Sequence, residues 1–559
     1  MSESSVGFVE LAPMIPWARG NIALALLELE GMNQAQSASL TLLVDAAAAV
    51  DVAAWASASG LRCRAESTDP CADAYLETFD GRLYEAGFSL SIAHANKQRR
   101  LEWRRLDGQL LGFTPLRKAP KWASDLPAAW DAARSAIAMR ALNQTLRWHG
   151  DITRFRILDK RDKTVAALTV RQGELETAGP TSLEAPTVVT LEPLKGFESA
   201  AEDVRQAIFD ALGAPMVSVS LVPELHAHAG VDVAGVSSKF AARLAPESPA
   251  GNALASLLQL MRETLSVNEA GLRADIDSEF LHDFRVAVQR SRSLIARMKS
   301  LIDPDALEHL RAGLSWLGGA TGPVRDLDVY LLNIPRYQHL LGIQDQTSLE
   351  PLRVHLMRAQ RRAHRTLVRE LDRERYGEFL DWWDDLLERT LAMTQLDLAA
   401  MSPPAALPIR EVASTALAKQ WKRVCKGGRA IKANTRAEAL HELRIECKKL
   451  RYLLEAFRSL YDDAAMAKLV KSLKRLQDNL GDFQDLEIQQ ERVRQFAEEM
   501  QAGRNPPPLS TFLTMGRLIE QLRLGQQQAR ERFAQTWRVF DSPANSRFAR
   551  AAFVEEASH

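Results

Sequence analysis

His282-Asp-Phe-Arg-Val-Ala-Val-Gln-Arg-Ser-Arg292 and His441-Glu-Leu-Arg-Ile-Glu-Cys-Lys-Lys-Leu-Arg451 are two versions of one pattern, and they begin 159 residues apart. The same separation relates later pairs of positions: Leu317 and Leu476, Gly322 and Gly481, and Asp326-Leu-Asp328 and Asp485-Leu-Glu487. A constant offset across separate motifs indicates that a unit of several helices has been duplicated. Because much of the repeated pattern is basic surface, the duplication points to an anionic partner.

In each copy the basic residues fall on one side of a predicted helix. At about 100° per residue, the basic positions occupy a sector of roughly 80°. In the second copy they are His441, Arg444, Lys448 and Arg451, and in the first His282, Arg285, Gln289 and Arg292. Apolar residues such as Leu443 and Phe284 take the opposite side. Each helix is therefore predicted to bury one face and to present cations on the other.

A basic stripe is most often a solvated helix face, and that interpretation is the alternative here. Solvated faces usually mix acids with cations at i,i+4 spacing. Within the two motifs the basic sector contains no acid. The pattern therefore favours binding of an anion.

Neighbouring predicted helices carry further charges. One face in the second copy has Lys468, Lys471, Lys474 and Arg475, and a helix after the first motif has Arg353, Arg358, Arg361, Arg362 and Arg365. The acids Asp326, Asp328, Asp485 and Glu487 could bind a metal, but side chains two residues apart diverge on a helix. We interpret them instead as partners that orient nearby arginines, and we predict no metal site and no cofactor.

The 559 residues divide by composition into two halves of different character. Residues 1–250 hold 25 Lys and Arg against 30 Asp and Glu, whereas the rest hold 46 against 41. Residues 1–235 are predicted to be α+β, with strands near 39–44, 88–92, 101–105, 155–158 and 165–170 and helices near 45–58, 127–147 and 198–212. A linker is predicted at 236–253, followed by a helical region at 254–545 with repeats at 254–396 and 408–543.

Cysteine usage and hydropathy bear on the compartment. The four cysteines, Cys63, Cys71, Cys425 and Cys447, lack metal-ligand spacing, which fits a reducing cytosol. The start of the chain lacks the basic region of a secretion signal, and no apolar run is long enough to span a bilayer. We expect a cytoplasmic protein without a membrane partner.

The repeated motifs, including Leu317-Gly-Gly-Ala-Thr-Gly322-Pro-Val-Arg325-Asp326, resemble the CHAD family, which is named for conserved histidines in an α-helical domain. The resemblance covers about 254–540. It implies two four-helix bundles related by a pseudo-twofold axis, with basic faces that line a central cavity and bind inorganic polyphosphate. The basic positions implied by the family are His282, Arg285, Arg290, Arg292, His441, Arg444, Lys448, Lys449 and Arg451. Gln289 departs from the basic residue at Lys448, which implies weaker binding by copy one.

The N-terminal region resembles, more faintly, the CYTH domain, a β-barrel or tunnel fold of triphosphate hydrolases that is often fused to CHAD. Tyr75–Leu90 looks like a hairpin of that family, Gln172–Leu175 like a later turn, and Val236–Lys239 like the junction to CHAD. The family's Glu-x-Glu-x-Lys is replaced by Ser39, Thr41 and Leu43, or by Glu28 and Glu30 without the lysine. Ser91 and Ala93 replace an Arg-x-Arg pair, and Glu192 alone remains of an acidic strand.

Three functions compete. Without metal carboxylates and tunnel cations, phosphoryl transfer is not expected, so the first hypothesis is a non-catalytic protein that binds inorganic polyphosphate. The alternative is an inorganic triphosphatase that uses the CYTH-like domain. Nucleic-acid binding is disfavoured because no aromatic platform accompanies the stripes. Association with polyphosphate granules in the cytoplasm would fit the first hypothesis.

Overall fold

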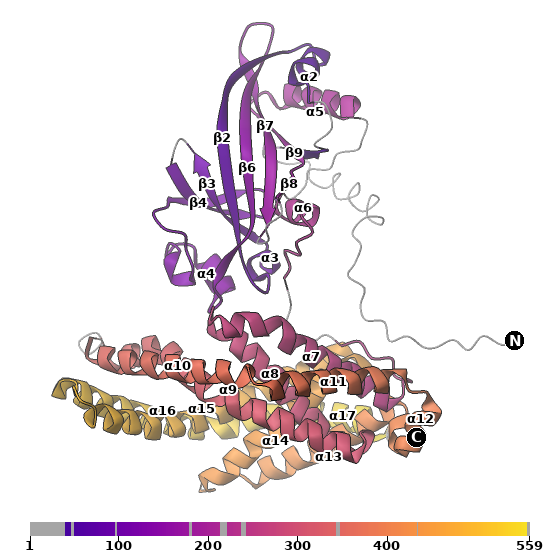
Figure 1. The fold of residues 1–559 in the computed structure, drawn as a ribbon, viewed down its shortest axis with the longest axis vertical. Coiled ribbons are helices and arrows are strands. Elements are labelled where there is room, and N and C mark those ends of the chain that lie inside the picture. Colours follow the sequence, from indigo (N-terminus) through magenta and orange to yellow (C-terminus); the bar gives the residue numbers. More distant parts are fainter. Residues whose placement is uncertain are drawn as a thin grey trace, which may run out of the picture. The chain divides into compact units, whose positions relative to one another are not determined.

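The computed structural model describes residues 40–45, 50–95, 98–177, 182–212, 221–235, 242–342, 347–432 and 434–555 (Figure 1). The chain separates into two compact units with the division between Ser238 and Lys239. The first is built on a sheet and the second is entirely helical in its regular structure. No helix in the described part of the chain is both long and apolar enough to cross a membrane.

The N-terminal unit is one antiparallel sheet in the order β1-β9-β7-β6-β2-β3-β4-β5, with β8 paired to β7. The strands are β1 (Leu40–Val44), β2 (Arg62–Thr78), β3 (Phe88–Ala95), β4 (Gln98–Arg105), β5 (Leu110–Pro115), β6 (Leu142–Leu158), β7 (Thr164–Thr177), β8 (Ser182–Glu184) and β9 (Thr187–Pro193). Among the described residues β1 and β5 are edges that do not pair with each other. The expected closed tunnel is therefore corrected to an open sheet.

Short helices cover separate parts of this sheet. The helices are α2 (Val52–Ala58), α3 (Arg82–Glu85), α4 (Asp131–Ile137), α5 (Glu198–Leu212) and α6 (Leu221–His228). Trp55 of α2 and Ile208 of α5 pack with Leu168 of β7 in one core. Ile137 of α4 packs with Leu90 and Leu101 in a second core, over β3 and β4. A third apolar cluster includes Leu146 and Trp148 of β6, and together these clusters explain why the unit holds together without closing.

The helix predicted at 127–147 is wrong in its second half. Helix α4 ends at Ile137, where Ala138 takes a left-handed conformation with φ of 51°. From Leu142 the chain is strand β6, and Leu142, Leu146 and Trp148 are buried at even spacing. Period-two burial against the neighbouring strands prevails over the helical propensity of the alanine-rich sequence before it.

The helical unit repeats with the register that the motifs predict. Copy one contains α7 (Ala250–Arg273), α8 (Ser278–Arg297), α9 (Pro304–Leu341) and α10 (Glu350–Leu371), and copy two contains α13 (Ile409–Ala430), α14 (Ala437–Ala456), α15 (Asp463–Gln501) and α16 (Leu509–Phe540). Each helix of copy two begins 159 residues after its counterpart. Helices α11 (Glu374–Ala392) and α12 (Gln395–Met401) follow copy one, and α17 (Pro543–Arg550) follows copy two.

The motif helices form as their sequence pattern indicates. Asp277 caps α8 by accepting hydrogen bonds from the backbone nitrogens of Glu279 and Phe280. Phe284 and Val288 are buried on α8, and the counterparts Leu443 and Cys447 are buried on α14. The basic side of each helix is left half-buried or exposed. The apolar stripe thus fixes the direction in which the cations point.

The two copies exchange equivalent contacts, as a pseudo-twofold axis requires. Just before α7 and α13, the nitrogen of Ala250 donates to the oxygen of Leu407 (2.8 Å), and the nitrogen of Ile409 to that of Ser248 (2.9 Å). Farther along, Tyr337 donates to Gln489 (3.0 Å) and Tyr330 packs on Phe496. Gln489 and Phe496 are the counterparts of Tyr330 and Tyr337.

The outer halves of α9, α10, α15 and α16 share one apolar core. Ile334 and Leu352 from copy one are buried with Val493 and Leu518 from copy two in this cluster. The implied picture of two separate four-helix bundles is therefore refined: a common apolar core joins the two copies at one end.

Candidate anion-binding face

In copy one, the arginines of α8 lie over small residues of α9. The Nη1 of Arg285 donates to the Gly318 carbonyl (3.1 Å) and to the Thr321 hydroxyl (2.9 Å). A methyl group at Gly318 would approach the Arg292 guanidinium to 3.0 Å, and at Gly322 it would lie 3.6 Å from that of Arg285. Both glycines lie inside α9 and do not cap a helix; Gly318 makes room for the Arg292 guanidinium, whereas a methyl group at Gly322 would make only an ordinary contact.

In copy two, the corresponding arginine has charged and polar partners. Arg444 donates to Asp485 (2.9 Å) and to Gln484 (2.8 Å), and its side chain is 17% exposed. Asp485 is one of the acids predicted to orient an arginine, and this contact confirms that prediction for Asp485. Its counterpart Asp326 lies near enough to Arg285 to attract it electrostatically.

The cations of each copy repel one another. Desolvation lowers the pKa of the Lys448 ammonium below its ordinary value, and the charges of Arg444 and Arg451 lower it further, against the opposing effect of Asp485. In copy one, burial lowers the pKa of the Arg285 guanidinium, and Arg325 and Arg292 add to the shift. Desolvation is the main cause of the pKa shift in both groups, and Asp326 opposes the effect of the two arginines on Arg285.

The two copies meet through charged residues of α8 and α14. The Nη2 of Arg290 donates to an oxygen of Glu455 (3.0 Å), and the Nε of Arg451 lies 3.2 Å from the other oxygen of that carboxylate. The hydroxyl of Tyr452 donates to Gln289 (3.3 Å). Six cations, Arg285, Arg290 and Arg292 with Arg444, Lys448 and Arg451, thus line the two motif helices on both sides of this junction; we call them the basic face.

The sequence of this unit matches a known family over the helices that carry the basic face. Residues 256–494 match the family described as CHAD domain. These residues form a CHAD domain. The match includes α8, α9, α14 and α15 and therefore both copies of the motif.

The chain resembles the crystal structure of the CHAD domain from the plant Ricinus communis, with 20% identity and a TM-score of 0.41 over 57% of this chain and 96% of that chain. It also resembles PptA from Streptomyces chartreusis, with 19% identity and a TM-score of 0.39 over 52% of this chain and 100% of that chain. No curated protein matches the chain, and no family match identifies the N-terminal sheet unit.

The other predicted site residues of the CHAD domain are not among the six cations of the basic face. Lys449 is paired with Glu446 (2.5 Å) on the flank of α14, and Glu446 also accepts from Gln420. The cations predicted on neighbouring helices are all exposed on α15 and α10: Lys468, Lys471, Lys474, Arg475, Arg358, Arg361 and Arg365. His441 is exposed and His282 is half-buried on the basic sides of their helices.

Glu455 and Tyr452 are site residues that the sequence pattern did not identify. Glu455 lies one turn beyond Arg451, so it falls in the same sector just outside the motif that was compared. Extending the helical count by four residues would have placed an acid there. The acid-free sector of the motif is therefore only locally acid-free, because α14 brings a carboxylate to the junction.

The remaining acids of the repeated motifs differ between the copies. Asp328 is buried, and burial raises the pKa of its carboxyl to about 6, opposed by the charge of Arg325. Its counterpart Glu487 is exposed. In the part of the chain that the structure describes, no group of three or more His, Cys, Asp or Glu side chains is arranged to hold a metal ion.

Some of the residues that replace the catalytic residues of the CYTH family lie in the described part of the sheet unit. Thr41 lies on β1 with its hydroxyl 3.5 Å from that of Thr190, and the neighbouring Leu43 packs in an apolar cluster. Ser91 and Ala93 lie on β3, and Glu192 is exposed on β9. Glu28, Glu30, Ser39 and the junction 236–239 lie outside the described residues.

The hairpin after Tyr75 is held by a buried carboxylate. Asp80 accepts hydrogen bonds from Thr78 (3.0 Å), Arg82 (2.9 Å) and the fully buried Arg140 (3.2 Å). Burial acts to raise the pKa of Asp80, but Arg140 and Arg82 outweigh it and lower the pKa below its ordinary value. This cluster stabilises the turn into α3. Gln172–Leu175, predicted as a turn, lies inside strand β7 instead.

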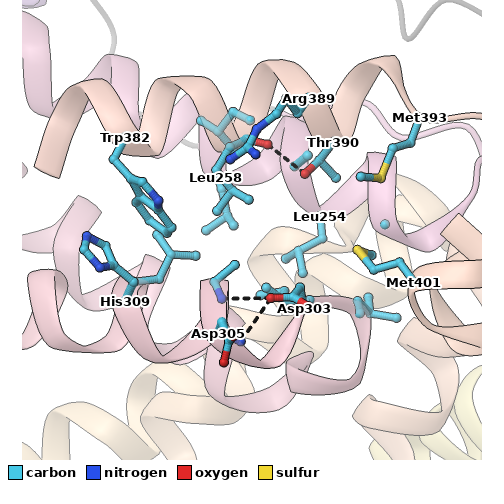
Figure 2. A pocket seen from close by; sticks show the side chains of 18 residues that line it. Leu254, Leu258, Asp303, Asp305, His309, Trp382, Arg389, Thr390, Met393 and Met401 are labelled. Carbon is cyan, nitrogen blue, oxygen red and sulfur yellow. Dashed lines mark hydrogen bonds between the residues drawn. The ribbon is translucent and has the colours of Figure 1, made fainter. Parts of the chain in front are cut away.

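A cavity of about 530 Å³ lies elsewhere in copy one, between α7, the start of α9 and α11 (Figure 2). Its walls are mostly apolar, and the ring of His309 lies 4.1 Å from that of Trp382. Asp303 at its edge caps α9 by accepting from the nitrogens of Asp305 and Ala306. None of the predicted basic site residues lines it.

Proposed function

We propose that this protein binds inorganic polyphosphate, without hydrolysing it, through the basic face of its CHAD domain. The observation that carries the proposal is the gathering of cations from both motif helices at the junction of α8 and α14, where Arg290 and Arg451 approach one carboxylate. A bound polyanion would offset the repulsion between neighbouring cations and add charge-assisted hydrogen bonds to them.

The arrangement suits a chain of phosphates better than a single one. The cations are spread along α8 and α14 in both copies, and arginine offers paired donors to phosphate oxygens. A chain with roughly one charge per phosphate can contact several of these groups at once, whereas one phosphate can contact few. The affinity is then the sum of several salt-sensitive contacts.

Nucleic acid is the competing polyanion, and the aromatic groups argue against it. In the described part of the chain, Tyr452 is the ring in contact with the basic face, and its hydroxyl is already donated to Gln289. One half-buried ring offers no row of surfaces on which bases could stack. The proposal therefore rests on phosphate recognition alone.

Competition tests the choice of polyanion. Labelled long-chain polyphosphate is bound to the full chain and displaced by unlabelled polyphosphate or by single-stranded RNA, at equal phosphate concentration. Polyphosphate is expected to displace the label at least about tenfold better, a difference of about 1.4 kcal/mol. Equal displacement by RNA would contradict the assignment.

We also propose that the sheet unit does not hydrolyse triphosphate. Thr41 and Leu43 supply neither the carboxylates nor the lysine that a metal-dependent phosphoryl transfer needs. Phosphate release from tripolyphosphate with Mg²⁺ or Mn²⁺ should be absent. Turnover of about 1 s⁻¹ that disappears in a Glu28→Ala, Glu30→Ala variant would restore the triphosphatase alternative.

A further inference from the structure

Glu455 joins one arginine from each copy. Its two carboxylate oxygens lie 3.0 Å from Arg290 of α8 and 3.2 Å from Arg451 of α14, and its side chain is 25% exposed. The counterpart of Glu455 in copy one is Ala296, which is exposed on α8 and carries no charge. The carboxylate at this junction therefore belongs to copy two only.

A carboxylate between two guanidinium groups occupies the place that two oxygens of a phosphate would take. A carboxylate and a phosphate each present two oxygens that arginine can bind with the same pair of N–H donors. A phosphate chain that uses Arg290 and Arg451 must therefore displace Glu455 from them. Because Glu455 is tethered to α14 within reach of both, it competes at a high effective concentration.

We propose that Glu455 is a built-in competitor that gives the basic face its preference for long phosphate chains over short ones. This inference rests on the proposed function. An anion with two or three phosphates gains too few contacts to displace the tethered carboxylate from both arginines. A long chain is already held by Arg285, Arg292, Arg444 and Lys448, so its next phosphates meet the same two arginines at comparable effective concentration.

The ordinary alternative is that Glu455 only holds α8 against α14. The two roles predict opposite effects on binding. If the carboxylate merely joins the helices, its removal loosens the basic face and weakens binding of every anion. If it competes, its removal strengthens the binding of short anions most, and the ratio of long-chain to short-chain affinity falls.

The test uses the full chain with Glu455→Gln, titrated with tripolyphosphate and with polyphosphate of about one hundred phosphates at about 0.1 M salt. Tripolyphosphate affinity is expected to rise about tenfold, as for one regained charge-assisted contact, and long-chain affinity to change less. Glu446→Gln is the matched control, because Glu446 lies on the same helix but pairs with Lys449 on the flank. It should leave the ratio of the two affinities unchanged.

A second variant adds a competing carboxylate to copy one, and it leaves the contacts of Glu455 with Arg290 and Arg451 intact. Ala296→Glu places a carboxylate at the exposed counterpart position of Glu455, one helical turn after Arg292. It should weaken tripolyphosphate binding several-fold and raise the preference for long chains. An unchanged ratio in both folded variants overturns the role of Glu455. Loss of the proposed function looks different: the unaltered protein then fails to bind long-chain polyphosphate.

Discussion

Copy one and copy two share their helix register but not their ion pairs. Arg285 in copy one donates to a carbonyl and a hydroxyl, whereas its counterpart Arg444 donates to the carboxylate of Asp485. Copy two also supplies Glu455 to the arginines at the junction. The cations therefore occupy equivalent positions in the two copies, but their hydrogen-bond and ion-pair partners differ. Arg444 of copy two is paired with an acid of its own copy, whereas its counterpart Arg285 has neutral hydrogen-bond partners.

This difference opposes the effect expected from the sequence. Gln289 in place of a basic residue implies weaker anion binding by copy one. The contacts imply the reverse, because an anion at Arg444 has to replace the carboxylate of Asp485, whereas Glu455 has to be replaced in both copies. An arginine with neutral partners offers more to an incoming phosphate than one with an acidic partner.

The largest expected effect is the loss of three cations from one copy. Arg285→Ala, Arg290→Ala and Arg292→Ala together should weaken long-chain polyphosphate binding by at least about 100-fold, since each charge-assisted contact contributes about 1.5–3 kcal/mol. Arg444→Ala, Lys448→Ala and Arg451→Ala should cost less, because an anion in copy two must also displace Asp485 from Arg444, whereas Glu455 is displaced in both copies. Titration of the full chain measures both.

A control and a contrary result complete this comparison. Arg523→Ala removes a charge that is paired with Glu520 on the exposed side of α16, and it should leave the affinity within about twofold. A copy-two triple variant that binds ten times more weakly than the copy-one variant would show that Gln289 dominates. Circular dichroism establishes that all variants are folded.

A smaller effect concerns Asp328, an acid that is buried in copy one and whose counterpart in copy two is exposed. Burial raises the pKa of Asp328 to about 6, so the folded state holds this proton more tightly than the unfolded state. The contribution of Asp328 to stability should therefore be greatest below about pH 4 and be lost as pH rises through about 6. Asp328→Asn, which keeps an oxygen for the Gln360 amide, should stabilise the domain by about 1–2 kcal/mol at pH 7.5.

The counterpart supplies the control for Asp328. Glu487 is exposed, and Glu487→Gln should change the free energy of unfolding by less than about 0.5 kcal/mol at either pH. Thermal melts at pH 4 and 7.5 give the difference between the variants. If Asp328→Asn stabilises the domain equally at both pH values, the raised pKa of Asp328 is not the cause of the stabilisation.

The smallest expected effect has opposite signs for stability and binding. Desolvation and the neighbouring arginines lower the pKa of Lys448, so the charge of Lys448 destabilises the free protein at neutral pH. This destabilisation should be lost as pH rises past the pKa of the ammonium in the folded state. Lys448→Gln restores the residue of copy one. It should raise stability by about 0.3 kcal/mol, since the group is largely exposed, and weaken polyphosphate binding several-fold. Lower stability together with unchanged affinity would mean that Lys448 only packs.

The sequence predicts the helical unit well because this unit contains an internal repeat and clear apolar stripes. The offset of 159 residues relates the starts of all four helices in each copy, and the apolar stripes identify which side of α8 and α14 is buried. The pairing of Asp485 with Arg444 also follows from the motif. These features are local to a helix or are repeated, so they need no knowledge of long-range contacts.

What the sequence does not predict depends on contacts between distant segments. Glu455 meets Arg290 only because α14 crosses α8, and no spacing in the chain encodes that meeting. The open edge of the sheet depends on whether β1 and β5 meet, which neither strand reveals alone. The first part of strand β6 was missed because the alanine-rich run before it favours a helix, while its own pattern is satisfied only beside β2 and β7; its end, at 155–158, was predicted as a strand.

The most direct measurement of the central claim is a titration of long-chain polyphosphate into the full chain, with and without all six cations of the basic face. The variant carries Arg285→Ala, Arg290→Ala, Arg292→Ala, Arg444→Ala, Lys448→Ala and Arg451→Ala, and leaves the exposed cations of α10 and α15 in place. Tight, salt-sensitive binding by the unaltered protein and its loss by at least about 1000-fold in the folded variant are predicted. Equal affinity of the two proteins would contradict the claim that this face binds polyphosphate.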